Sequence, residues 1–161
     1  MRIIAGEHRG RKLAAPKGDG TRPTTDRVRE SLMSAIASAR GGFEGAMVLD
    51  AFAGSGALAF EALSRGAAAA VLGERNGAAL RAIEANAAAL GYGRDRARIA
   101  RGDVLGHGFP APPQGAAFDL VFLDPPYAVA PADVLGLAAR AAEGGLLAPD
   151  VLVSYEHDAA A

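Results

Sequence analysis

The chain has 161 residues, half of them hydrophobic and 22% charged, which fits one soluble domain with a core of its own. It contains no cysteine, which excludes disulfides, thiolate metal sites and cysteine nucleophiles. Its net charge of −1 argues against a general polyanion binder, and because it shows neither a signal peptide nor an apolar run of membrane-spanning length, we expect a cytoplasmic protein.

Positive charge is concentrated near the N-terminus, where the first thirty residues carry eight Arg or Lys against four Asp or Glu. Residues 2–6 and 9–13 predict a short two-stranded arm with too little apolar surface to form a core. A local basic excess on a nearly neutral chain is typical of a nucleic-acid contact surface. We therefore predict a basic arm over residues 1–25 that is separate from the domain formed by residues 26–161.

A helix is predicted from Asp26 to about Ala39, with Thr24 or Thr25 as its N-cap. After it, strands and helices alternate. Strands are predicted over 47–52, 69–74, 97–100, 118–123 and 151–156, and helices over 57–65, 76–90 and 131–142. This alternation predicts a Rossmann-like α/β fold, with a mostly parallel sheet, helices on both faces and a ligand site at the carboxyl ends of the strands.

A glycine turn and three acidic residues follow the first three predicted strands. Gly54 and Gly56 let a ligand approach the backbone closely, and the helix that follows offers free N–H groups. Glu74 lies twenty residues past Gly54, the spacing at which a carboxylate accepts the ribose hydroxyls of an adenosine. Asp103 ends the third strand, where it could accept the amine of adenine. Together these residues indicate an adenosine-containing cofactor.

Asp50 distinguishes between two such cofactors. The glycine motif alone leaves NAD possible. A carboxylate four residues before Gly54 is unfavourable beside a pyrophosphate but suits the ammonium of a methionine moiety, which favours S-adenosylmethionine. An NAD-dependent oxidoreductase would also need a substrate domain, for which the chain has no room.

The fourth predicted strand ends in Asp124-Pro125-Pro126-Tyr127. Each proline fixes its φ near about −65°, and Asp124 is held extended because it precedes a proline. A carboxylate, backbone carbonyls and an aromatic ring then form a rigid shelf for a planar group that carries an N–H. We predict that Asp124 and the Pro125 carbonyl accept the two hydrogens of a base amine, that Asp124 or a neighbouring water takes the released proton, and that Tyr127 stacks on the base.

The two site motifs, residues 50–56 and 124–127, resemble the class I methyltransferases that modify exocyclic amines of nucleobases. Residues 2–6, 9–13 and 22–30 resemble the RsmD family, bacterial methyltransferases of guanine N2 in 16S ribosomal RNA. The resemblance covers essentially the whole chain. It implies S-adenosyl-L-methionine as the methyl donor and, as partner, 16S rRNA in the small ribosomal subunit or its assembly intermediate, and we expect a monomer.

The site residues expected on this basis fall into three groups. The catalytic group is Asp124, Pro125, Pro126 and Tyr127. The cofactor-binding group is Asp50, Phe52, Gly54, Ser55, Gly56, Glu74 and Asp103. The RNA-binding group is Arg9, Arg11, Lys12, Arg22 and Arg27. The three histidines lack metal-ligand spacing, so no metal site is expected.

Two departures from the family pattern leave alternatives open. The methyltransferase sheet ends in a β-hairpin that we expect to be missing here, and Asn76 stands where relatives would have an acid. The alternatives are an N6-adenine or other exocyclic-amine methyltransferase, and a catalytically impaired relative that binds cofactor and RNA.

Overall fold

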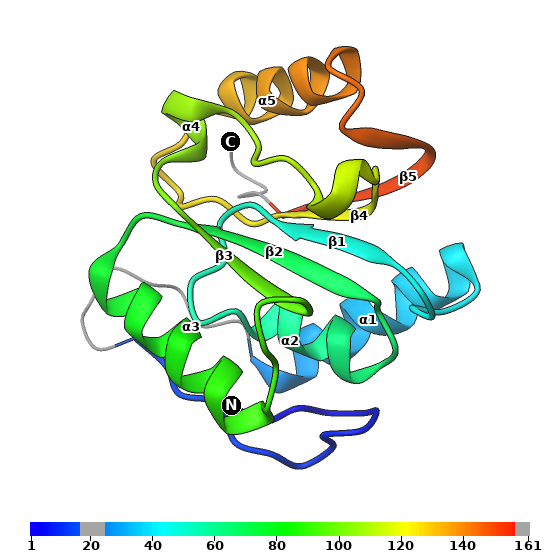
Figure 1. Cartoon of the computed structure of the whole chain (residues 1–161), viewed down its shortest axis with the longest axis vertical. Coiled ribbons are helices and arrows are strands. Elements are labelled where there is room, and N and C mark those ends of the chain that lie inside the picture. Colours follow the sequence, from blue (N-terminus) through cyan, green and yellow to red (C-terminus); the bar gives the residue numbers. More distant parts are fainter. Residues whose placement is uncertain (17–24, 157–161) are drawn as a thin grey trace.

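The computed structural model describes residues 1–16 and 25–156, and Figure 1 shows three layers with the sheet in the middle. α1, α2, α3 and the N-terminal segment cover one face of the sheet, and α4 and α5 lie on the other. The helices are α1 (Asp26–Arg40), α2 (Ala57–Ser64), α3 (Gly77–Leu90), α4 (Val104–His107) and α5 (Pro131–Glu143), and Pro113–Gly115 forms a 3-10 turn. The strands are β1 (Met47–Asp50), β2 (Ala69–Glu74), β3 (Ala97–Arg101), β4 (Phe118–Leu123) and β5 (Leu147–Tyr155).

The five strands pair in the order β3-β2-β1-β4-β5, and all four pairings are parallel. β1 is therefore central, and its last residue, Asp50, is level with Leu72 of β2 and Phe122 of β4. Short βα units force each helix to cross over the sheet before the next strand begins. The predicted α/β architecture is confirmed.

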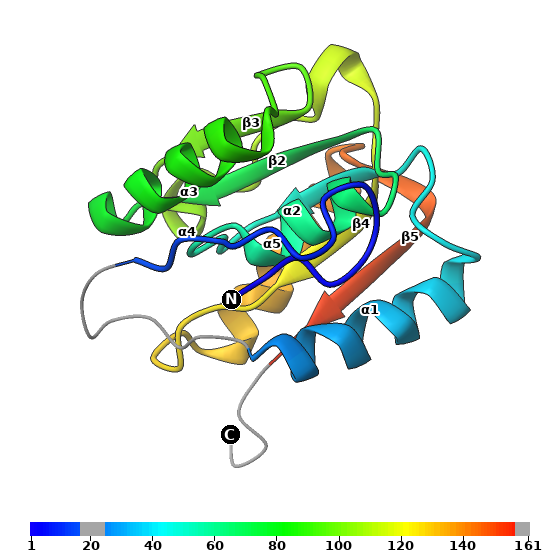
Figure 2. The same cartoon turned by 90° about the horizontal axis from the view of Figure 1, so that it is seen from below.

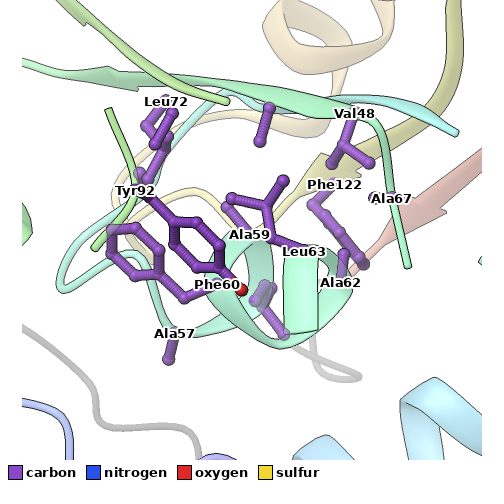
Figure 3. Packing of buried hydrophobic residues seen from close by; sticks show 14 of the residues in the cluster. Val48, Ala57, Ala59, Phe60, Ala62, Leu63, Ala67, Leu72, Tyr92 and Phe122 are labelled. Carbon is purple, nitrogen blue, oxygen red and sulfur yellow. The ribbon is translucent and has the colours of Figure 1, made fainter. Parts of the chain in front are cut away.

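The larger core cluster lies between the sheet and the helices α1 to α3 (Figure 3). α2 is buried at all eight of its positions. Phe60 of α2 stacks on Tyr92, with ring centroids 6.3 Å apart, and Val48 and Phe122 reach the same cluster from β1 and β4. Burying one such large side chain contributes roughly 1.5–3 kcal/mol.

Several element boundaries differ from those predicted. β1 ends at Asp50, so residues 51 and 52 belong to the turn. α3 begins one residue later than expected because the Asn76 side chain caps it, accepting a hydrogen bond from the Ala79 amide at 3.0 Å. β5 starts four residues early, since its edge position tolerates Pro149. The loop before β4 contains α4, which the sequence pattern did not indicate.

The N-terminal segment is part of the core, which corrects the expectation of a purely appended arm. It folds back at one antiparallel bridge, Arg2 to Lys12. Ile3 and Leu13 are buried in the cluster under α2. Figure 2 shows the segment running beneath α2, between α3 and α1. The predicted division at residue 25 therefore separates two sequence regions that pack together.

A buried carboxylate on α2 holds this segment in place. Glu61 is fully buried and accepts hydrogen bonds from the amides of Ile4 (2.9 Å) and Ala5 (3.1 Å). It also pairs with Arg29 of α1 (3.4 Å) and Arg65 (2.9 Å). One side chain therefore joins the N-terminal segment, α1 and α2.

Arg29 completes this connection from the side of α1. It is fully buried, and its guanidinium donates to the Arg2 carbonyl and to Asp26, the latter at 2.9 Å. Arg29, a basic residue of the family-like segment 22–30, is thus engaged inside the protein and is not available to RNA.

Close backbone approach explains Gly6. Its φ is +88°, and an added Cβ would lie 1.9 Å from the Ser64 carbonyl oxygen. The Ser64 hydroxyl donates to the Ala5 carbonyl (2.7 Å) and accepts from the His8 amide (3.0 Å). The segment therefore follows the end of α2 at a separation that only glycine permits.

No helix in the described part of the chain combines the length and apolar character that crossing a bilayer requires. Within residues 1–16 and 25–156, no three His, Asp or Glu side chains are grouped as metal ligands would be.

Candidate cofactor and acceptor site

Three carboxylates meet where β1, β2 and β4 end. Asp50 is level with Leu72 and Phe122, so Glu74 and Asp124 each lie two residues farther along their strands. At the rise of a parallel strand, that is about 7 Å beyond Asp50. The structure thus brings together three of the side chains that the sequence predicted for one site.

Asp50 is the most unusual of the three. Its side chain is buried, with 1% of the residue exposed, and neither carboxylate oxygen has a partner with hydrogen-bond geometry among the described residues. Burial, together with the charges of Asp124 and Glu74, raises the pKa of Asp50 to about 8, while the nearby Ala59 amide opposes the shift. A buried carboxyl group between two other acids is a site that a cation would stabilise.

The two glycines of the turn serve different purposes. An added Cβ at Gly56 would lie 2.5 Å from the Phe60 ring and 2.9 Å from Leu72, so this glycine is required by packing. Gly54 has a φ of +60°, and an added Cβ there would meet no atom within 4 Å. Only Gly54 therefore has the open surface that was expected of both.

Glu74 fixes the turn from the side of β2. Its carboxylate accepts from the Gly54 amide at 2.8 Å, and from the amides of Arg75 (3.0 Å) and Asn76 (2.9 Å). Charged hydrogen bonds of this kind are among the stronger ones in proteins. These hydrogen bonds tie the glycine turn to the end of β2.

Asp103 has local partners as well. It caps α4 by accepting from the Leu105 amide at 3.0 Å, and it faces Arg75 at 3.4 Å across the end of β2. Both members of this ion pair are substantially exposed, so the pair contributes little to stability and can open readily.

The two remaining cofactor candidates, Phe52 and Ser55, have side chains that are largely covered by the protein. Phe52 is partly buried against the core cluster on the α5 face. Ser55 is 9% exposed, and its carbonyl accepts a hydrogen bond from Asn86 at 3.0 Å.

The predicted acceptor shelf directly follows β4. Asp124 is half-buried, Pro125 is buried, and Tyr127 is 65% exposed. The Pro126 carbonyl is occupied by the Val129 amide at 3.0 Å, whereas no described backbone amide donates to the Pro125 carbonyl. The carbonyl that was predicted to accept an amine hydrogen therefore has no backbone donor from the described residues.

The basic candidates differ in their engagement. Arg9, Lys12 and Arg27 are exposed. Arg11 is exposed too, but its guanidinium donates to the Ala89 carbonyl near the end of α3 at 2.5 Å. Arg22 lies outside the described residues.

Sequence reasoning missed the buried polar residues Glu61, Arg29, Ser64 and Asn86. Most of their partners are distant in the chain, for example Glu61 for Arg29, 32 residues away, and Ala14 for Asn86, 72 residues away. The one available signal was a charged residue, Glu61, in the mainly apolar sequence of α2.

The strand order, the glycine turn and the acidic strand ends define a Rossmann-like class I methyltransferase fold. A precorrin-6Y C5,15-methyltransferase domain from Rhodobacter capsulatus shares the fold, with a TM-score of 0.59 at 22% identity over 86% of this chain and 65% of that one. The chain belongs to the family described as Conserved hypothetical protein 95, whose model matches residues 1–161.

Relatives within this family are considerably more similar. The ribosomal RNA small subunit methyltransferase D of Escherichia coli is 45% identical over 127 residues, or 79% of this chain. The chain spans 60% of the length of that curated relative. A solved structure of a candidate methyltransferase from Escherichia coli, yhhF, has a TM-score of 0.79 and 37% identity over 99% of this chain and 82% of that one. The expected resemblance to the RsmD family is confirmed.

Proposed function

We propose that this chain transfers a methyl group from S-adenosylmethionine to the exocyclic N2 of a guanine in 16S ribosomal RNA. The observation that carries the proposal is Asp50, a buried carboxyl group without a hydrogen-bond partner among the described residues, between Glu74 and Asp124. The names of the curated relatives supply the class of substrate.

The residues at the strand ends fit S-adenosylmethionine by their chemistry. Asp50 would hold the ammonium of the methionine moiety, Glu74 the ribose hydroxyls and Asp103 the amine of adenine, with Gly54 allowing close backbone approach. Asp103 would exchange its exposed pairing with Arg75 for that amine. When bound, the cofactor supplies an electrophilic methyl group on a sulfonium.

The residues after β4 would hold the acceptor. Asp124 accepts one hydrogen of the guanine amine, and the Pro125 carbonyl accepts the other. The nitrogen lone pair, otherwise delocalised into the ring, is then directed at the methyl group. Asp124, or a water next to it, receives the proton that nitrogen loses when the new C–N bond forms. Stacking of the extruded base on exposed Tyr127 would contribute roughly 1–3 kcal/mol.

A methyl-transfer assay tests this proposal. The chain is incubated with tritiated S-adenosylmethionine and small ribosomal subunits from a strain that lacks the modification, and the labelled nucleoside is identified after digestion. We expect N2-methylguanosine. N6-methyladenosine would establish the alternative acceptor, and absence of label despite measurable cofactor binding would indicate an impaired relative.

Cofactor affinity should rise with pH. Since burial raises the pKa of Asp50 to about 8, this carboxyl is mostly protonated in the free protein at pH 6 to 7.5, and binding an ammonium requires it to ionise. Each pH unit in this range should therefore strengthen the binding of S-adenosylhomocysteine by up to about tenfold. The series stays below the pKa of the ligand's own α-amino group, about 8.

Calorimetry at several pH values measures this dependence, and Asp50→Asn is the reference variant. The asparagine cannot ionise, so its affinity should be weaker and nearly independent of pH. An equal pH dependence in the two proteins would contradict the assignment of Asp50.

Charge reversal at Arg9 and Lys12 should weaken binding to small-subunit RNA by at least about tenfold at moderate salt. The slope of log affinity against log salt should also become shallower by about 1 to 2, because each lost phosphate contact removes part of the counterion release. Arg11 is left unchanged, since its contact with Ala89 also supports the fold. Filter binding over a salt series measures both quantities.

The matched control is Arg140→Glu, an exposed position on α5 across the sheet from the N-terminal segment (Figure 1). It should leave RNA affinity within about twofold of the wild type. A loss as large as that of the double variant would contradict an RNA contact at the segment.

A further inference from the structure

A buried amide on α3 has partners in two different regions of the protein. Asn86 is 2% exposed. Its Nδ2 donates to the carbonyls of Ser55 and Ala14, both at 3.0 Å, and its Oδ1 accepts from the Ala14 amide at 2.7 Å. Three of the four hydrogen bonds that an asparagine side chain can form are thus made to backbone groups.

Ser55 and Ala14 belong to two regions with different proposed ligands, the glycine turn for the cofactor and the N-terminal segment for RNA. Ser55 lies in the glycine turn, whose neighbouring Gly54 amide is held by Glu74. Ala14 follows directly on Leu13, which anchors the basic N-terminal segment in the core. A second, weaker contact links the same regions, since the Ser55 hydroxyl lies 3.9 Å from the Met1 sulfur.

The hydrogen bonds of Asn86 make the N-terminal segment and the glycine turn dependent on each other. Because Asn86 binds both the amide and the carbonyl of Ala14, a shift of this backbone breaks two hydrogen bonds and leaves buried polar groups without partners. The asparagine would then also lose its orientation toward the Ser55 carbonyl. A ligand that fixes the segment therefore also fixes the turn.

We infer that Asn86 is a positioning residue that couples the N-terminal segment to the glycine turn, so that RNA on the segment and cofactor at the turn strengthen each other's binding. This inference rests on the proposed function, because it requires both ligands. By thermodynamic linkage the two enhancements are equal. Couplings of this kind commonly reach fivefold or more.

The test measures S-adenosylhomocysteine affinity in the absence and in the presence of saturating small subunits from a strain that lacks the modification. The wild type should bind the ligand at least about fivefold more tightly when the subunit is present. Asn86→Ala should reduce this enhancement to less than about twofold, while its affinity for the ligand alone stays within a few-fold of the wild type.

Two further variants make the result specific. Asn86→Asp keeps the shape and the acceptor for the Ala14 amide but cannot donate to the Ser55 carbonyl, so it too should lose the coupling, even if the alanine variant fails to fold. Ser64→Ala is the matched control, because the Ser64 hydroxyl also makes two hydrogen bonds to the segment but none to the described residues of the turn. It should retain the coupling.

The outcomes separate the inference from the function beneath it. If Ser64→Ala loses as much coupling as the Asn86 variants, general loosening of the segment explains the effect and the inference is wrong. If the wild type binds both ligands without coupling, the inference is wrong and the proposed function stands. If the wild type binds neither ligand, the proposed function is overturned, and the inference with it.

Discussion

Replacing Asp124 with alanine should lower the rate of methyl transfer by about 10²–10⁴-fold, the usual contribution of a positioned proton acceptor. The loss should fall on the chemical step. S-adenosylhomocysteine should still bind within a few-fold of the wild-type affinity, because removal of the Asp124 charge only lowers the pKa of Asp50 and makes its ionisation easier. Single-turnover methylation of small subunits at saturating cofactor measures the rate, and a thermal melt verifies the fold.

Asp124→Asn refines this test, since its amide oxygen can still accept one hydrogen of the guanine amine but cannot take the proton. Its rate should lie between those of the wild type and the alanine variant. Asp133→Ala, an exposed carboxylate in the first turn of α5, is the control and should remain close to the wild type. A near-wild-type rate for Asp124→Ala would rule out the proposed role of this carboxylate.

Glu61→Ala should lower the free energy of unfolding by about 3–5 kcal/mol. The substitution leaves the buried Arg29 guanidinium without one of its two carboxylate partners and removes the acceptor from the amides of Ile4 and Ala5. A loss of that size is a large fraction of the roughly 5–15 kcal/mol by which a domain is typically stable. Equilibrium denaturation in urea measures it.

A matched control separates this effect from that of an ordinary surface ion pair. Glu84 pairs with Arg101 where both side chains are largely exposed, so Glu84→Ala should change stability by at most about 1 kcal/mol. The double variant Arg29→Met/Glu61→Leu removes both buried charges and should recover part of the loss. If Glu61→Ala stays within about 1 kcal/mol of the wild type, Glu61 does not hold the segment.

The parts of this fold that could be predicted from sequence are those with a local signal. Alternating apolar runs and glycine turns identified the strands and the helices that cover them, and parallel pairing then placed Asp50, Glu74 and Asp124 at one edge. The arrangement of the site follows from topology, because the carboxyl ends of parallel strands share one side of the sheet.

The interior polar contacts could not be predicted in the same way. Charged side chains are almost always assigned to the surface unless a partner is known. Of the partners of Glu61, Arg29 is 32 residues away and Ile4 is 57 residues away, so no window of local sequence contains both ends of these two bonds. For the same reason the basic segment was expected to lie apart from the domain, whereas Ile3 and Leu13 pack inside it.

The long reach of these contacts also sets the order in which the protein can assemble during translation. Ala14 is made 72 residues before its partner Asn86, and Ile4 is made 57 residues before Glu61. At synthesis rates of about 5–20 residues per second, the segment waits roughly 4–14 s for Asn86. We therefore expect the first residues of this chain to gain their native contacts long after their own synthesis, so that the basic surface is completed only after β1, β2 and the helices that follow them have been synthesised.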